Sequence, residues 1–385
     1  MKYDKLAIVG LGNVGELVAI SSIMGNGFNE VYVYNRDSRP VNGRSRSDAK
    51  LRNLTDAAVM YNTQVIRCDS YDDLPSDALT VITIKEGYDY RFVPANRIRQ
   101  VTSRKDAPLM RKVAEAYARK DFTGQVLMVS NPIGPMSHLF QHYSGIDDSQ
   151  IHPVGAMLDS ARYTKFIKQR LGVPEADVDA LAVGEHGPSV VFLRSSATVD
   201  GRPLNSYGID LAKVERDTMR EGPIEATTIG YTNAGITACL QRMFGILQSE
   251  DVKPRFPFGM RYEDVFVELP VVKLDGVYTI QWPDFDRLEK QAFDRSVRGI
   301  RRDSEEILGY ATERQIRRVL VVDDELAEAE TLVMTLEEAV LDDLGLSDQN
   351  EFYFEVVGSG QSFVDAVKDD PIGYDLAIVD QRMPG

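Results

Sequence analysis

The sequence contains a set of polar residues that together could reduce a 2-keto acid. His186 lies in a glycine-flanked turn, GEHGPS, and Asp159 and Arg162 precede it in the segment LDSAR. The planar guanidinium of arginine can donate two hydrogen bonds to a carboxylate, and histidine is the usual general acid for a keto oxygen that becomes a hydroxyl. Asp159 would orient the imidazole, and the amide of Asn131 could hold the reacting oxygen. Each residue taken singly is more often structural, so the prediction depends on the set.

A glycine-rich turn near the N-terminus predicts a dinucleotide site. In LAIVGLGNVGELVAI, Gly10, Gly12 and Gly15 follow the order GxGxxG, with Asn13 and Val14 between them. An apolar run precedes the glycines and a helix-like pattern follows them, which is the context that this fingerprint requires. The glycines permit a tight turn and a close approach of the backbone to a pyrophosphate at the start of the helix. We therefore expect all five residues to bind the cofactor.

Residues 1 to about 302 resemble the lactate/malate dehydrogenase family. The matching segments occur in the family's order: GLGNVG, VSNP, LDSARY, GEHGPSVVFLRSSATVDGRPL, YEDVFVELPVVKLDGVYTI and KQAFDRSV. The resemblance implies a nicotinamide-dependent 2-hydroxy acid dehydrogenase acting on a malate-like or lactate-like substrate.

The same resemblance implies a role for each polar residue of the set. His186 would donate and accept the proton, Asp159 would be its partner, and Arg162 would anchor the substrate carboxylate. Asn131 would contact the reacting oxygen. Arg104, in TSRKD, resembles the arginine of the family's mobile loop that polarises the carbonyl.

Two further residues are candidates for substrate contact. The segment EGYDYRFVPANRIRQVTS is longer than the active-site loop of the family, in which an arginine favours a second carboxylate, as in malate. Arg97 and Arg99 flank Ile98, and the inserted residues leave either as that arginine; we take Arg99 as the candidate, with solvated residues of the lid as the alternative. Thr232, in GYTN, resembles a position in the wall of the family's pocket, and helix packing accounts for it equally well.

The end of the second expected strand bears on the choice of cofactor. Family members that use NAD place an acidic residue there to hold the ribose hydroxyls, whereas this chain has Asn35 followed by Arg36. Without the carboxylate there is less repulsion against a 2′-phosphate, and Arg36 could pair with one. We expect NADP in preference to NAD. NAD is the alternative, with Asp37 in the acidic role.

Alternating apolar and helical segments predict an α/β fold with a Rossmann-type doubly wound parallel sheet, followed by an α+β substrate domain. The expected division has four parts: a dinucleotide-binding domain over residues 1–130, a substrate and catalytic domain over 131–302, a helical connector over 303–318, and a C-terminal domain over 319–385. Gly309 is a plausible break in the helical region.

The C-terminal segment differs from the rest of the sequence in its strongly acidic composition. Residues 319–385 contain 17 acidic and 2 basic residues, so they carry the whole net charge of −15. One apolar run ends in Asp323 and Asp324, and another leads into Asp380 and QRMPG. This pattern resembles a flavodoxin-like response-regulator receiver domain, which implies Mg²⁺ bound by the first pair and Asp380 as the phosphoacceptor. Carboxylate oxygens suit Mg²⁺. Because the sequence stops after the third expected strand, we expect a truncated receiver that does not transfer a phosphoryl group.

The composition of the sequence limits the classes of partner and the cellular compartment that we expect. Two cysteines cannot form a disulfide framework, and no apolar run approaches the roughly 20 residues of a membrane helix. Clusters of lysine and arginine typical of nucleic-acid surfaces are missing from the sequence. We expect a cytoplasmic protein with a small-molecule substrate and neither a nucleic-acid nor a membrane partner. The family resemblance implies a homo-oligomer, and the receiver resemblance implies a histidine kinase or phosphorelay partner.

Two hypotheses follow. The first is an NADP-preferring 2-hydroxy acid dehydrogenase. The alternative is a signalling protein whose dehydrogenase-like part senses cofactor or keto acid for the receiver. Lys85, which stands where the family has an Ala-Gly pair, and the longer lid leave room for the alternative, whereas the intact His186, Asp159 and Arg162 favour catalysis. A combination, in which receiver phosphorylation biases an active enzyme, is the third option.

Overall fold

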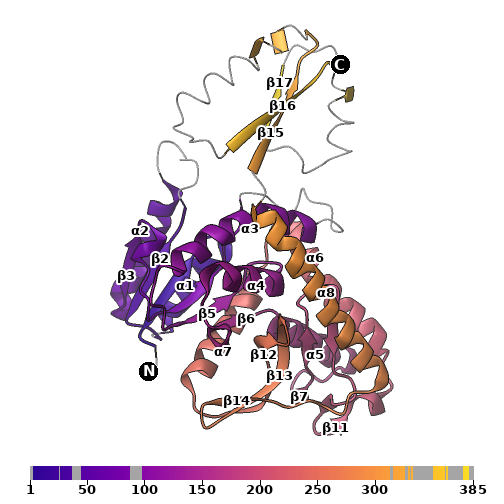
Figure 1. Cartoon of the computed structure of the whole chain (residues 1–385). Helices are drawn as coiled ribbons and strands as arrows, with labels where there is room; N and C mark the ends of the chain where they lie inside the picture. The colour runs from indigo at the N-terminus through magenta and orange to yellow at the C-terminus, as the bar shows by residue number, and fades with distance from the viewer. Residues whose placement is uncertain are drawn as a thin grey trace. The chain divides into compact units, whose positions relative to one another are not determined.

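The computed structural model describes residues 3–25, 27–36, 45–86, 98–312, 315–325, 328–329, 331–332, 350–359, 361–362 and 376–380 (Figure 1). The chain forms two compact units. The first comprises residues 1–91 and 102–311, and the second comprises residues 92–101 and 312–385.

The first unit is built on a six-stranded parallel sheet in the order β3-β2-β1-β4-β5-β6. The strands are β1 (Lys5–Val9), β2 (Glu30–Tyr34), β3 (Gln64–Cys68), β4 (Leu79–Ile82), β5 (Gln125–Met128) and β6 (Ile151–Pro153). The strand order reverses between β1 and β4, which is the switch point where ligands bind in sheets of this kind. The predicted Rossmann-type sheet is confirmed.

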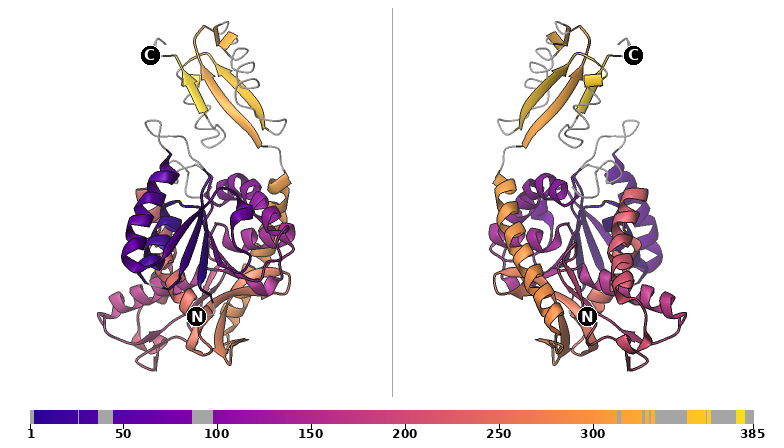
Figure 2. Two further views of the ribbon diagram at one scale, coloured as in Figure 1. Left: turned by 90° about the vertical axis from the view of Figure 1, so that its left-hand side faces the viewer. Right: turned by 90° about the vertical axis from the view of Figure 1, so that its right-hand side faces the viewer.

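Helices cover both faces of this sheet (Figure 2). They are α1 (Asn13–Met24), α2 (Arg46–Tyr61), α3 (Ile98–Tyr117) and α4 (Ile133–Ser144). Because the sheet is covered on both sides, its central strands read as continuous apolar runs, and Leu6 to Val9 are fully buried.

The rest of the first unit is the expected mixture of helices and antiparallel strands. The larger sheet has the order β12-β13-β8-β9, with β14 paired to β13, and a small sheet has the order β11-β10-β7. Its strands are β7 (Val178–Asp179), β8 (Ala182–Gly184), β9 (Val190–Phe192), β10 (Thr198–Val199), β11 (Arg202–Pro203), β12 (Val252–Tyr262), β13 (Val265–Leu274) and β14 (Val277–Ile280). Its helices are α5 (Ala156–Leu171), α6 (Leu211–Ile229), α7 (Ala234–Gln248) and α8 (Arg287–Thr312).

Two expected boundaries differ from the structure. The parallel sheet does not end before residue 130, because β6 pairs with β5. The expected break at Gly309 is not present, because α8 continues through Gly309 to Thr312, and β15 begins at Gln315 within the range expected for the connector. The buried face of α8 explains this continuity, since it extends past the glycine at helical spacing: Phe293, Val297, Ile300, Ile307 and Ala311.

The second unit contains a three-stranded parallel sheet in the order β16-β15-β17. The strands are β15 (Gln315–Val322), β16 (Asn350–Val357) and β17 (Leu376–Val379). The end of β15 is buried from Leu320 to Val322.

Neither cysteine forms a disulfide, since Cys68 and Cys239 are both buried free thiols. Among the helices that the structure describes, none is long and apolar enough to cross a membrane.

Candidate active site

The glycine-rich turn lies between β1 and α1 and is tightly packed on one side. Gly10 has a φ of +102°, and a Cβ on Gly15 would lie 1.9 Å from the carbonyl oxygen of Gly10. A side chain is therefore excluded at both positions. Gly12 differs, because a Cβ there would meet nothing within 4 Å. This exposed opening, next to the exposed Asn13 and partly buried Val14 at the start of α1, has room for a pyrophosphate.

The end of β2 is tied to this turn by Asn35. Its Oδ1 accepts a hydrogen bond from the backbone N–H of Leu11 at 2.9 Å, and its Nδ2 donates to Oγ of Ser47 at 2.7 Å. Arg36 is half exposed, and its Nη2 lies 2.7 Å from Oε1 of Glu86. Asp37, the alternative acidic residue, lies outside the described residues.

A small cavity adjoins Asn35. Its lining is made of apolar side chains, neutral polar groups and one guanidinium: Leu11, Val33, Asn35, Ser47, Leu51, Arg67 and Cys68. This lining is compatible with an uncharged or anionic part of a cofactor.

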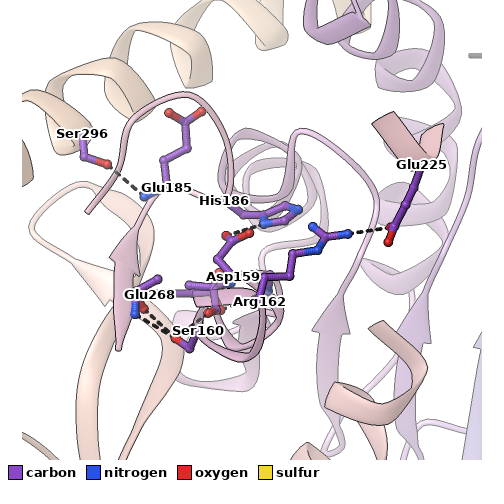
Figure 3. A network of polar contacts seen from close by, with 11 residues as sticks. Asp159, Ser160, Arg162, Glu185, His186, Glu225, Glu268 and Ser296 are labelled. Carbon is purple, nitrogen blue, oxygen red and sulfur yellow. Dashed lines mark hydrogen bonds and ion pairs between the residues drawn. The ribbon is translucent and has the colours of Figure 1, made fainter. Parts of the chain in front are cut away.

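His186 and Asp159 are brought together as the sequence predicted. Asp159 lies in the first turn of α5 and His186 in the loop between β8 and β9, and the His186 Nδ1 lies 2.7 Å from the Asp159 Oδ2 (Figure 3). Burial lowers the pKa of His186, but the charge and hydrogen bond of Asp159 raise it, and the net shift is upward. The protonated imidazole is thus favoured at this position. Close packing requires Gly155 here, because a Cβ on it would lie 2.5 Å from the Cβ of His186.

Arg162 follows Asp159 by one turn of α5 and is 8% exposed. Its guanidinium lies beside the imidazole of His186 in Figure 3. Its Nη2 pairs with Oε2 of Glu225 on α6 at 2.8 Å. The structure therefore places a buried arginine beside the His186–Asp159 pair.

No protein-family model matches the chain, but known dehydrogenases are similar to it in sequence. The chain is 27% identical over 313 residues to the L-lactate dehydrogenase of Mycoplasma mycoides subsp. mycoides, a match that covers 76% of this chain and 93% of that protein. It is 26% identical over 276 residues to the malate dehydrogenase of Sulfolobus acidocaldarius, covering 70% and 85% of the two chains. Over about 80% of its length, this chain is similar to lactate and malate dehydrogenases.

Solved structures show the same fold. The malate dehydrogenase of Aeropyrum pernix superposes with a TM-score of 0.68 at 23% identity, covering 78% of this chain and 97% of that one. The malate dehydrogenase of Cryptosporidium parvum gives a TM-score of 0.67 at 21% identity, covering 80% and 99%. None of these similarities shows a receiver domain, which stays a prediction.

Within this lactate/malate dehydrogenase fold, the sequence analysis missed one buried acid, Glu268 on β13. The residue is 2% exposed, and its carboxylate accepts hydrogen bonds from the backbone N–H groups of Gly155 at 3.0 Å and Ala156 at 2.5 Å. Burial raises the pKa of Glu268 to about 7, although the two N–H groups and His186 oppose the rise. The only signal in the sequence was a single glutamate within the apolar run of β13.

Asn131 and Thr232 occupy loops at helix ends. Asn131 is exposed between β5 and α4, at the carboxyl end of the parallel sheet, and Thr232 is partly buried between α6 and α7. Both places are compatible with the predicted contacts.

Arg104, expected in a mobile loop, lies on the helix α3. This residue is exposed on α3, and its guanidinium lies over the ring of Tyr310, 5.4 Å from the ring centre. The segment is helical because Thr102, Asp106 and Met110, four residues apart, form one buried face. Arg99 lies in the first turn of α3, and its side chain is outside the described part of the chain.

In the second unit, the three predicted acidic residues meet at the ends of two neighbouring strands. Each of Asp323, Asp324 and Asp380 offers a carboxylate oxygen, and these oxygens lie within 4.8 Å of one another. Asp380 also donates its backbone N–H to the carbonyl of Val322 at 2.9 Å, which fixes the end of β17 beside that of β15. The donor set fits Mg²⁺ by its chemistry.

Proposed function

We propose that this chain is a nicotinamide-dependent oxidoreductase that interconverts a 2-hydroxy acid and a 2-keto acid, of the malate or lactate kind. The observation that carries the proposal is the His186–Asp159 pair beside the buried Arg162 (Figure 3). These groups match the three requirements of the reaction, which are a proton donor, its orienting carboxylate and a carboxylate anchor.

In the proposed mechanism, the guanidinium of Arg162 binds the substrate carboxylate and so places the keto carbon beside His186. The Nδ1 of His186 is held by Asp159, which leaves Nε2 to give its proton to the oxygen on reduction and to take it back on oxidation. A bound nicotinamide supplies or accepts the hydride. Asn131 would stabilise the developing negative charge on the oxygen. Arg104 would do so only if the start of α3 rearranged.

The site fits a dinucleotide because the space above Gly12 is open while Gly10 and Gly15 close the turn beneath it. We propose a preference for NADP over NAD. Two observations support it: the amide Asn35 stands at the end of β2, and Arg36 follows it. The ion pair between Arg36 and Glu86 opposes the preference, because a 2′-phosphate must compete with that carboxylate.

The decisive test is oxidation of NADPH and NADH with oxaloacetate, pyruvate and bulkier 2-keto acids, with His186→Ala as the control. We expect turnover with one group of substrates and its loss in the variant, with cofactor binding retained. A chain that binds the cofactor and turns over none of the substrates would instead support the sensor.

A second candidate function concerns the C-terminal unit. We propose that it is part of a receiver domain, on the basis of the parallel order β16-β15-β17 and the meeting of Asp323, Asp324 and Asp380. The first two residues would hold Mg²⁺, and Asp380 would be the phosphoacceptor. Calorimetric titration with Mg²⁺ should show binding that Asp323→Asn removes, and equal binding by the variant would reject the site.

A further inference from the structure

Three ion pairs connect α5 to α6. The carboxylates on α6 are four residues apart, so they lie on one face of the helix, and they meet cations of α5 in antiparallel order. The pairs are Arg170–Asp217, Lys165–Glu221 and Arg162–Glu225.

The Arg162–Glu225 pair differs from the other two in its burial. The side chains of Lys165 and Arg170 are each 41% exposed, whereas that of Arg162 is 10% exposed. The two exposed pairs are of the kind that contributes little to stability. The third pair contains Arg162, the candidate substrate anchor.

The backbone of α6 also approaches Arg162 closely. A Cβ on Gly222 would lie 3.0 Å from Nη1 of Arg162, so the glycine leaves just enough space for the guanidinium. Glu225, one turn further on, then reaches Nη2 at 2.8 Å. One side of the guanidinium is thus already engaged by a carboxylate of the protein.

This engagement changes the charge that a substrate meets. The formal charges of Arg162 and Glu225 cancel, and a substrate carboxylate bound to the remaining N–H donors of Arg162 would lie near a like charge. Like charges a few ångströms apart in a partly buried site repel each other strongly. The penalty grows with the negative charge of the substrate, so it is greater for a dicarboxylate than for a monocarboxylate.

We propose that Glu225 is a specificity-determining residue that selects 2-keto acids with a single carboxylate and an uncharged side chain over dicarboxylates such as oxaloacetate. The inference rests on the proposed role of Arg162 as the substrate anchor.

The test compares Glu225→Gln with Glu221→Gln. Both changes remove one negative charge from α6, one helical turn apart, but Glu221 pairs with Lys165 and not with Arg162. We measure kcat/KM for oxaloacetate and pyruvate. In Glu225→Gln the ratio should shift about tenfold towards oxaloacetate, mainly through KM, which corresponds to about 1.4 kcal/mol. In Glu221→Gln the ratio should stay as in the wild type.

Glu225→Asp, which keeps the charge, serves as the second variant and should stay closer to the wild type than Glu225→Gln. An unchanged ratio in Glu225→Gln, or an equal shift in both glutamine variants, overturns the inference while the dehydrogenase activity stands. If the wild type turns over no 2-keto acid, the proposed function fails. Calorimetric binding of oxamate and tartronate to the cofactor-loaded variants then decides the inference: a shift towards tartronate in Glu225→Gln alone supports it, and equal selectivity overturns it.

Discussion

Asp159 and His186 are 27 residues apart in the sequence and share a hydrogen bond of 2.7 Å between the carboxylate Oδ2 and the imidazole Nδ1. The carboxylate therefore fixes which ring nitrogen faces the substrate, and its charge favours the imidazolium.

Asp159→Asn tests this relationship. The pKa of His186 should fall when the negative charge is removed, so the protonated imidazole needed for reduction is lost at a lower pH than in the wild type. We expect kcat/KM for keto-acid reduction to fall about a hundredfold or more near neutral pH, with a smaller loss in the oxidation direction, which needs the neutral imidazole. Steady-state rates in both directions from pH 5 to 9 measure this. Equal losses in both directions with an unmoved profile would contradict it.

The glycine-rich turn gives a matched pair of variants. Gly15→Ala should destabilise the fold by about 2 kcal/mol or more, because its Cβ would lie 1.9 Å from the carbonyl oxygen of Gly10. Gly12→Ala should leave the unfolding midpoint nearly unchanged, since its Cβ meets nothing within 4 Å, yet weaken cofactor binding by filling the open space. Thermal unfolding and cofactor fluorescence titrations separate the two effects. Undiminished binding by Gly12→Ala would mean that the pyrophosphate lies elsewhere.

The ion pair between Arg36 and Glu86 leads to a prediction about cofactor choice. Glu86→Gln removes the carboxylate that competes for Arg36, so the ratio of NADPH to NADH affinity should rise several-fold. Arg36→Ala should lower the same ratio. Dissociation constants for both cofactors measure these changes, and a ratio that neither variant moves would refute the 2′-phosphate role.

Glu268 should make the stability of the protein depend on pH. Its pKa of about 7 in the folded state lies above the ordinary value of 4.5, so between these values the folded state holds a proton that the unfolded state has lost. The free energy of unfolding should therefore fall as the pH rises from about 4.5 to 7, by about 3 kcal/mol at most. The raised pKa of His186 acts in the same direction.

Glu268→Gln removes this titration and should flatten the dependence. Urea unfolding midpoints from pH 5 to 8 compare the two proteins. A slope in the variant as steep as in the wild type would assign the dependence to other groups.

The local elements of the fold were predictable because their signals lie within short windows. The second strand was expected to end beside Asn35, and β2 ends at Tyr34. The glycine order located the turn that α1 follows. The run of Asp323 and Asp324 after an apolar strand likewise marked the end of β15. The glycine signal failed at Gly309, where a break was expected but the periodic buried face of α8 continues.

The sequence by itself determined the type of sheet, the glycine turn and the residues available for proton transfer, because each depends on neighbours along the chain. Only the tertiary structure decided which charges meet. Glu86 reaches Arg36 across 50 residues, Glu225 reaches Arg162 across 63, and Glu268 reaches the start of α5 across more than 100. The electrostatics of a site depend on the distances between charges in space. A sequence pattern within a single helix or strand does not encode those distances.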